Sequence, residues 1–243
     1  MIRLVLAVLF VALFLIVSIP ILFVLWIIGK FDVNLKKRAS LAIVSWAFRV
    51  VKFISGTKLT VIGHENIPEN TGVLYIGNHL SYFDIVLSYP LVAGLTGYIA
   101  KKQIRKVPVL GLWMKNLDCL FLDRDDIRQG LQTILTAIDK VKEGISICIY
   151  PEGSRKKGDE VIGEFHKGSF KIAQRTNCPI IPMTIVNSRD IFEAHPFYIK
   201  PKHVIIEYGE PVYYNDLSND DQKHVDQYVR NIISETYIRN VNL

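Results

Sequence analysis

A long apolar stretch at the N-terminal end constrains the fold of this chain more than any other feature. From Leu4 to Ile28 there is no charged residue, and nearly every position is Leu, Val, Ile, Phe, Ala or Trp. A helix needs about 20 apolar residues to cross a bilayer core of about 30 Å, so this stretch is long enough to span a membrane. A cleaved signal peptide has a shorter apolar core that ends in a small-residue cleavage site, whereas Ile-Ile-Gly-Lys-Phe-Asp follows Trp26 here. We therefore expect a retained membrane anchor.

The geometry of the anchor is left open by Pro20, which divides the apolar stretch and can kink or break a helix. One tilted span and a pair of shorter helices that enter the bilayer and return are both compatible with the sequence. A second helix is predicted from Ser40 to Ser55. Four polar or basic positions fall at helical spacing on one narrow face: Arg38, Ser45, Arg49 and Lys52. Basic residues opposite Trp and Phe are typical of a helix lying in the membrane interface, and an ordinary core helix is the alternative.

The net charge of +6 is located beside the apolar stretch and not on the main body of the chain. Between Lys30 and Lys58 there are seven basic residues and one acidic residue, Asp32, whereas the chain from Leu59 onward has 21 basic and 22 acidic residues. Juxtamembrane Lys and Arg favour the cytoplasmic, anionic leaflet. We therefore expect the main domain on the cytoplasmic face of the cell membrane, and no nucleic-acid partner.

Beyond Thr57, short β-rich runs alternate with helical patterns. The runs with strand character are Leu59–Gly63, Gly72–Gly77, Thr96–Ala100, Cys119–Leu122, Ser146–Tyr150, Ile180–Val186 and Val204–Tyr208. The helical patterns are Phe83–Val92, Val109–Lys115, Ile127–Lys142, Lys167–Thr176 and Asp220–Ile238. This alternation predicts an α/β fold, with a mixed, largely parallel sheet flanked by helices and an N-terminal membrane-anchoring helix or helix pair. We place the anchor and interfacial helix in residues 1–56 and the main domain in residues 57–243.

The three cysteines are predicted to be reduced core residues. Cys119, Cys148 and Cys178 each lie in an apolar stretch, and no C-x-x-C pair occurs. The sequence therefore supports neither a zinc site nor a disulfide framework.

The first candidate site is the segment from Asn78 to Asp84, where polar residues follow an apolar strand and precede a helix. Ligands of α/β proteins usually bind at such strand ends. An imidazole such as that of His79 can act as a general base in catalysis at neutral pH. Asp84 can fix the tautomer of the imidazole and stabilise its protonated form. The alternative is that Ser81-x-x-Asp84 only caps the following helix.

Three further strand ends carry cations. Gly153 allows the backbone to approach a ligand, and Arg155 suits paired hydrogen bonds with a phosphate. Arg124 follows the strand that ends at Leu122, and Lys102 follows the strand that ends at Ala100. Each of these segments alone is also compatible with a solvated surface turn. Together with His79 they point to a phosphorylated substrate and acid–base chemistry, and the G-x-S-x-G, P-loop, G-x-G-x-x-G and H-E-x-x-H motifs are absent from the sequence.

These segments together resemble the glycerolipid acyltransferase family, specifically its bacterial 1-acylglycerol-3-phosphate acyltransferase branch. The N-H-x-x-x-x-D motif is present from Asn78 to Asp84, and F-[IL]-D-R is present from Phe121 to Arg124. The family's F-P-E-G-T-R block is similar to Tyr150–Arg155, and its P-[IV]-[IV]-P stretch matches Pro179–Pro182. The elements that accompany these blocks are also matched: Lys102, Pro108, Gly111, Phe165, Lys167 and Gly168. The resemblance covers about residues 57 to 213. Three positions depart from the usual residues: Tyr150 and Ser154 replace Phe and Thr, and Asp118 replaces a glycine.

The resemblance implies a fatty acyl thioester donor, on coenzyme A or acyl carrier protein, and lysophosphatidic acid as the acceptor. It implies that 57–243 is an acyltransferase catalytic domain in which His79 is the general base and Asp84 supports it. The residues expected to bind the substrate are Asn78, Lys102, Arg124, Glu152, Gly153, Ser154 and Arg155. No metal and no cofactor other than the acyl co-substrate is expected.

Two alternatives stay open. The acceptor can be a different lysophospholipid or a lyso-aminolipid, in which case activity depends weakly on the acceptor phosphate. The chain can also be a non-catalytic membrane module that binds anionic lipid through Lys30–Lys58, in which case His79 is dispensable.

Overall fold

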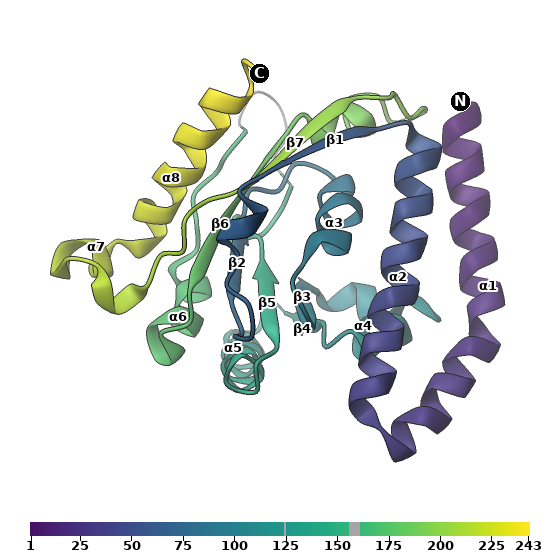
Figure 1. The fold of residues 1–243 in the computed structure, drawn as a ribbon, viewed down its shortest axis with the longest axis horizontal. Coiled ribbons are helices and arrows are strands. Elements are labelled where there is room, and N and C mark those ends of the chain that lie inside the picture. Colours follow the sequence, from purple (N-terminus) through teal and green to yellow (C-terminus); the bar gives the residue numbers. More distant parts are fainter. Residues whose placement is uncertain (124, 156–160) are drawn as a thin grey trace.

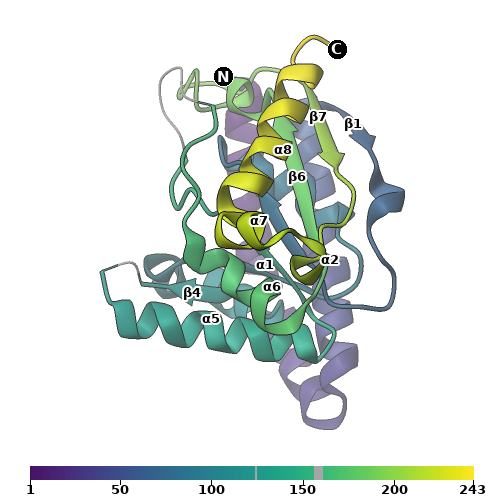
Figure 2. The ribbon, with the colours of Figure 1, turned by 90° about the vertical axis from the view of Figure 1, so that its left-hand side faces the viewer.

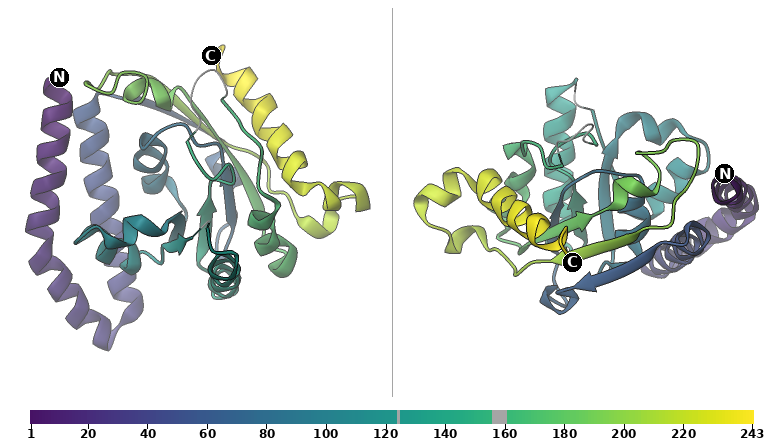
Figure 3. Two further views of the ribbon diagram at one scale, coloured as in Figure 1. Left: turned by 180° about the vertical axis from the view of Figure 1, so that it is seen from behind. Right: turned by 90° about the horizontal axis from the view of Figure 1, so that it is seen from above.

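The computed structural model describes residues 1–123, 125–155 and 161–243. Two long helices lie side by side at one end of the molecule and lead into an α/β domain, as Figure 1 shows. The N-terminal helices are α1 (Ile2–Phe31) and α2 (Val33–Ser55). They run antiparallel, because the backbone of Asp32 between them is extended and the chain reverses there (Figure 3).

The helix α1 continues through Pro20 and is not broken by it. Its 30 residues correspond to a length of about 45 Å. Among the described residues it is the one helix long and apolar enough to cross a membrane by length and composition. Most of its side chains face away from the protein, and only Ala7, Ser18 and Leu25 are buried. Of the two geometries that the sequence left open, the structure therefore has one unbroken apolar helix paired with a second, less apolar one.

The helix α2 begins at Val33, seven residues before the predicted start. The carboxylate of Asp32 caps it by accepting a hydrogen bond from the Leu35 amide at 2.9 Å. It packs against α1 on one side and against helices of the α/β domain on the other. Its inner face buries small or branched side chains: Ser40, Val44, Ser45, Ala47, Val51 and Ser55. That face fits the core-helix alternative, while Trp46 and Phe53 remain exposed.

The α/β domain is built on a seven-stranded sheet in the order β1-β7-β6-β2-β5-β3-β4. The strands are β1 (Lys58–Ile62), β2 (Leu74–Gly77), β3 (Thr96–Lys101), β4 (Leu120–Leu122), β5 (Ser146–Ile149), β6 (Ile180–Val186) and β7 (His203–Tyr208). All neighbouring pairs are parallel except β6 and β7. The predicted mixed, largely parallel sheet is therefore confirmed, and each predicted strand is present.

Helices cover both faces of the sheet. They are α3 (Phe83–Ser88), α4 (Leu110–Asn116), α5 (Ile127–Lys142), α6 (Lys171–Thr176), α7 (Asn219–Lys223) and α8 (Val225–Asn240). The predicted helix from Phe83 to Val92 ends at Ser88 and continues as a 3₁₀ turn that contains Pro90. The predicted helix from Asp220 to Ile238 is divided at His224.

Alternate residues of each central strand enter two separate cores, as period-two geometry requires. Tyr75 packs into one core with residues of α1 to α4, whereas Leu74 and Ile76 pack into the other with residues of α5, α6 and α8. Figure 2 shows α6 and α8 in front of the sheet, with α1 and α2 behind it. The three cysteines are buried and free, which confirms their prediction as reduced core residues. Burial raises the pKa of the Cys119 thiol to about 12, so this thiol is not a nucleophile at neutral pH.

Candidate active site

Four adjacent parallel strands, β2, β5, β3 and β4, end at one edge of the sheet, and the candidate site residues follow these ends. Asn78 and His79 follow β2, and Glu152 follows β5. The side-chain amide of Asn78 is completely buried. It donates to the Ile185 carbonyl at 2.9 Å and accepts from the Ile185 amide at 2.8 Å. This pair of bonds fixes the start of the His79 loop against β6, so Asn78 positions the loop.

His79 and Asp84 form a hydrogen-bonded pair. Nδ1 of His79 lies 2.8 Å from Oδ2 of Asp84, and the same oxygen accepts from the amides of Leu80 and Ser81 at 2.8 Å each. Asp84 is completely buried, whereas the His79 side chain is 17% exposed. The carboxylate therefore both caps the loop at the start of α3 and orients the imidazole, so the two interpretations of Asp84 coexist. Nε2 of His79 has no hydrogen-bond partner among the described residues.

The imidazole of His79 is also held by an aromatic ring. It stacks on Tyr150 with ring centroids 4.3 Å apart and an interplanar angle of 14°. Tyr150 lies where the family has Phe, and burial raises the pKa of its hydroxyl, so the ring stays neutral. A neutral stacked ring restricts the imidazole without competing for its proton.

The segment after β5 brings a carboxylate and a guanidinium to the same edge. Oε1 of the buried Glu152 accepts from the His79 amide at 3.0 Å, which joins the two loops. Gly153 has a φ of 75°, in the left-handed region that favours glycine. Ser154 is exposed, and Arg155 lies 3.7 Å from the ring centroid of Tyr82. The geometry thus places the predicted phosphate-binding arginine beside the loop that carries His79.

Lys102 and Asp123 pair across the ends of β3 and β4, with Nζ and Oδ2 2.8 Å apart. The hydrogen bond with Asp123 raises the pKa of Lys102, and the same contact lowers the pKa of Asp123. The Lys102 side chain is half exposed, so it remains accessible to an anionic ligand. Arg124, predicted to bind the same phosphate, lies outside the described residues.

Glu193 is a site residue that sequence reasoning missed. It lies after β6, in a loop with no recognisable motif, and a single acidic residue in a loop carries no signal of its own. Its Oε2 accepts from the Ser81 hydroxyl at 2.6 Å, and its Oε1 accepts from the Tyr82 amide at 2.7 Å and from Nη1 of Arg155 at 3.0 Å. Within the described ranges no group of three or more His, Cys, Asp or Glu residues is arranged to hold a metal ion.

Comparisons with known proteins identify the family and the fold. A family model described as Acyltransferase matches residues 58–186. A 1-acyl-sn-glycerol-3-phosphate acyltransferase of Borreliella burgdorferi is 30% identical over 72% of this chain and 67% of its own length. A probable enzyme of the same name from Mycoplasma pneumoniae is 28% identical over 76% of this chain and 73% of its own. The crystal structure of the 1-acyl-sn-glycerophosphate acyltransferase from Thermotoga maritima matches 98% of this chain and 97% of its own with a TM-score of 0.78, and at 22% identity this likeness concerns the fold.

Proposed function

This chain belongs to the acyltransferase family, and on that basis we propose that it transfers a fatty acyl group from an acyl thioester to the 2-hydroxyl of lysophosphatidic acid. The product is phosphatidic acid, a precursor in phospholipid biosynthesis. The single observation that carries the proposal is the oriented His79–Asp84 pair beside Arg155 at one edge of the sheet. The donor is an acyl-coenzyme A or an acyl carrier protein thioester.

The proposed reaction is a direct transfer without an acyl-enzyme. Nε2 of His79 takes the proton of the acceptor hydroxyl as its oxygen attacks the thioester carbonyl. The new C–O bond forms, the C–S bond breaks, and the proton passes from His79 to the departing thiolate. Asp84 stabilises the imidazolium between these two steps. A positioned base contributes about 10²- to 10⁴-fold, and holding both substrates in place contributes much of the remaining rate enhancement.

The acceptor phosphate is proposed to bind to Arg155, Lys102 and Arg124, which follow three neighbouring strands. Gly153 and Ser154 leave the backbone before Arg155 open to the ligand, and Glu152 holds this loop to the His79 loop. A phosphate monoester is doubly charged or nearly so at neutral pH, which suits a guanidinium that offers several donors.

Replacing Arg155 by Gln is expected to raise the KM for lysophosphatidic acid by about 10- to 100-fold, since a charge-assisted contact to the phosphate is lost. The KM for the acyl donor should change less than about twofold, because the phosphate belongs to the acceptor. Steady-state kinetics with each substrate varied in turn measures both constants. Arg175→Gln, on the exposed surface of α6, is the matched control and should leave both unchanged.

An acceptor profile separates this proposal from its alternatives. Lysophosphatidic acid should be preferred to lysophosphatidylethanolamine and to a lyso-aminolipid. Equal rates with acceptors that lack a phosphate monoester, and an unchanged KM in Arg155→Gln, would assign the chain to another acceptor. Binding to anionic lipid without transfer from any donor would favour the non-catalytic module.

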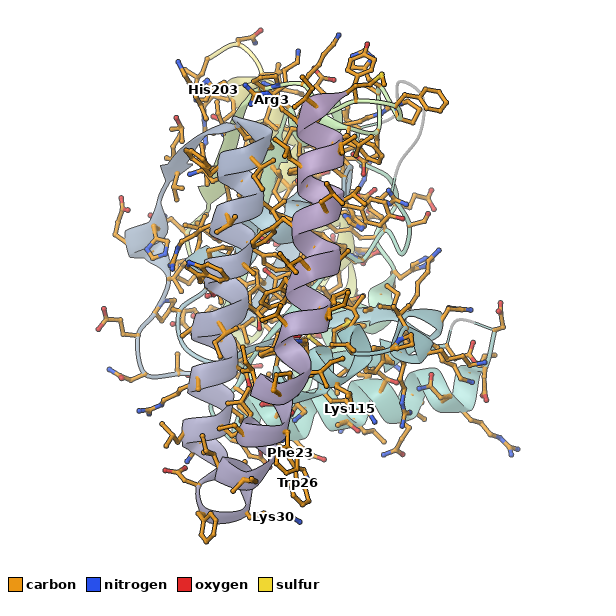
Figure 4. The ribbon with its side chains drawn as sticks, turned by 90° about the vertical axis from the view of Figure 1, so that its right-hand side faces the viewer. Arg3, Phe23, Trp26, Lys30, Lys115 and His203 are labelled. Atoms are coloured by element: carbon orange, nitrogen blue, oxygen red, sulfur yellow. The ribbon has the colours of Figure 1, made fainter. Side chains whose placement is uncertain are left out.

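The antiparallel pair α1 and α2 is proposed to hold the domain at the cell membrane, with the catalytic domain on the cytoplasmic face. A cavity of about 630 Å³ lies between α1 and the segment that leads into α4. One wall is apolar and contains Phe23 and Trp26, and the other carries Arg105, Lys106 and Lys115. Figure 4 shows Phe23, Trp26 and Lys115 toward the same end of α1, with Lys30 at the reversal of the chain. Cations beside exposed aromatic rings suit the headgroup region of an anionic leaflet.

Neutralising these cations is expected to reduce the preference of the protein for anionic membranes. Each basic residue near an anionic surface contributes about 1 kcal/mol, so Arg105→Gln, Lys106→Gln and Lys115→Gln together should lower that preference at least about tenfold. The ratio of protein bound to phosphatidylglycerol-containing and to pure phosphatidylcholine vesicles, offered in one mixture, measures the effect. Neutralising Lys171, Arg175 and Lys223 is the charge-matched control, and an equal loss in that variant would contradict a role for this face.

A further inference from the structure

We infer that Glu193 is a positioning residue that joins the base and the phosphate-binding arginine into one unit, an inference that rests on the proposed function. It lies beyond residues 58–186, the range that the family model matches. Its carboxylate contacts two groups that belong to different loops, the Ser81–Tyr82 turn after β2 and Arg155 after β5. None of the hydrogen bonds that its carboxylate makes among the described residues is with the imidazole, so any effect it has on catalysis passes through these neighbours.

Through the Ser81–Tyr82 turn, Glu193 helps to fix the position of the base, His79. The Asp84 carboxylate accepts hydrogen bonds from the amides of Leu80 and Ser81. The Glu193 carboxylate accepts hydrogen bonds from the Ser81 hydroxyl and from the amide of the next residue, Tyr82. Two carboxylates thus bind successive backbone donors of one turn. A shift of Glu193 would therefore move the turn in which Asp84 holds His79.

Glu193 also fixes the orientation of the Arg155 side chain. The guanidinium of Arg155 lies over the Tyr82 ring and donates Nη1 to Glu193 at 3.0 Å. These two contacts fix the plane of the guanidinium, and its other donors have no partner among the described residues. An arginine held in this way loses less conformational entropy when it binds a phosphate than one that is free to rotate.

The segment that carries Glu193 is itself well anchored. The preceding 3₁₀ turn runs from Ser188 to Ile191, and Ile191 is completely buried. The Ile191 carbonyl accepts from the Lys200 amide at 2.9 Å, which closes the loop behind Glu193. The Glu193 side chain is 15% exposed, and each of its oxygens already accepts a donor. Its charge is offset by Arg155, so it can lie beside a phosphate site without being a free anion there.

Glu193→Gln tests this role, because glutamine has the same length but no charge, so the ion pair with Arg155 is replaced by a weaker hydrogen bond from the guanidinium to a neutral amide. We expect the KM for lysophosphatidic acid to rise about five- to twentyfold while the KM for the acyl donor changes less than about twofold. Asp190→Asn is the matched control, since Asp190 lies in the same segment but pairs with Lys202 at 3.2 Å, outside the site. The thermal midpoint of each variant reports whether the fold is retained.

A double-mutant cycle with Arg155 separates positioning from a general structural effect. If Glu193 acts through Arg155, Glu193→Gln should change the acceptor KM less than about twofold when Arg155→Gln is already present. The inference would be overturned if the effects of Glu193→Gln and Arg155→Gln on the acceptor KM were additive, or if Glu193→Gln changed the KM values of acceptor and donor equally. A fall in the acceptor KM would also overturn it, because it would mean that the carboxylate competes with the phosphate for Arg155. The comparison requires a wild-type protein that makes phosphatidic acid. An inactive wild type would therefore show that the proposed function is wrong, whereas the outcomes above concern Glu193 alone.

Discussion

Replacing His79 by Ala is expected to lower kcat by about 10²- to 10⁴-fold, which is the contribution of a positioned general base. The reason is geometric. His79 is the only imidazole at this edge of the sheet among the described residues that is paired to a buried carboxylate, and Nε2 is its available nitrogen. Rates of transfer from a labelled acyl thioester to lysophosphatidic acid measure the loss. The KM values should change far less than kcat, because the base acts in the transition state.

The variant must remain folded for this result to count. Loss of the imidazole removes the stack on Tyr150 and leaves Asp84 without one of its donors. The control is His203→Ala, since His203 is exposed and its side chain forms a hydrogen bond only with Thr60 among the described residues. A folded, membrane-bound His79→Ala enzyme with full activity would contradict the proposed mechanism.

The second large effect is expected for Asp84→Asn, which should lower kcat by about 10²-fold or more. The asparagine can keep the backbone hydrogen bonds through its oxygen. When its amide nitrogen takes the place of Oδ2 instead, the Leu80 and Ser81 amides lose their acceptor, and the imidazole must accept at Nδ1 and carry its hydrogen on Nε2. In that tautomer Nε2 cannot take a proton from the acceptor hydroxyl. The lost carboxylate also leaves the imidazolium without its counter-charge.

Asp226→Asn is the matched control for a buried carboxylate. Asp226 is buried in α8, on the opposite face of the sheet, and its carboxylate lies 4.0 Å from the Lys167 ammonium. We expect its kcat to stay within about twofold of wild type, since it has no contact with the reacting groups. If Asp84→Asn retained wild-type kcat while still folded, Asp84 would be only a cap of α3, and the tautomer argument would fail.

The sheet and most of the site follow from local patterns in the sequence. Short β-rich runs between helical segments were enough to locate each strand, and Ile127–Lys142 was predicted with the bounds that α5 has in the structure. The motif from Asn78 to Asp84 follows a buried strand, so its position at the carboxyl edge follows from α/β topology. These features depend on neighbours in the sequence, which is why a single sequence reveals them.

What the sequence did not reveal depends on contacts between distant segments. Glu193 contacts Ser81 and Arg155 across separations of 112 and 38 residues, and no periodicity reports such a meeting. The antiparallel arrangement of α1 and α2 follows from the chain reversal at Asp32 and the packing of the two helices against each other, which neither Pro20 nor the charge pattern specifies.

Asp118 illustrates a departure from the family that only the structure explains. It has a φ of 56°, in the region that favours the usual glycine, and aspartate tolerates that conformation better than most residues. Its carboxylate lies between Lys37 of α2 and Lys140 of α5. The side chain that replaces glycine therefore ties the N-terminal helices to the domain through a partly buried ion pair.

The most direct test of the account is transfer by the wild-type protein in anionic vesicles, supplied with lysophosphatidic acid and a ¹³C-labelled acyl thioester. Mass spectrometry of the lipid products identifies the acceptor and the position of the label. We predict phosphatidic acid with the labelled chain at the 2-position and one free thiol released for each molecule formed. Release of thiol with only labelled free fatty acid, or no phosphatidic acid from either an acyl-coenzyme A or an acyl carrier protein donor, would contradict it.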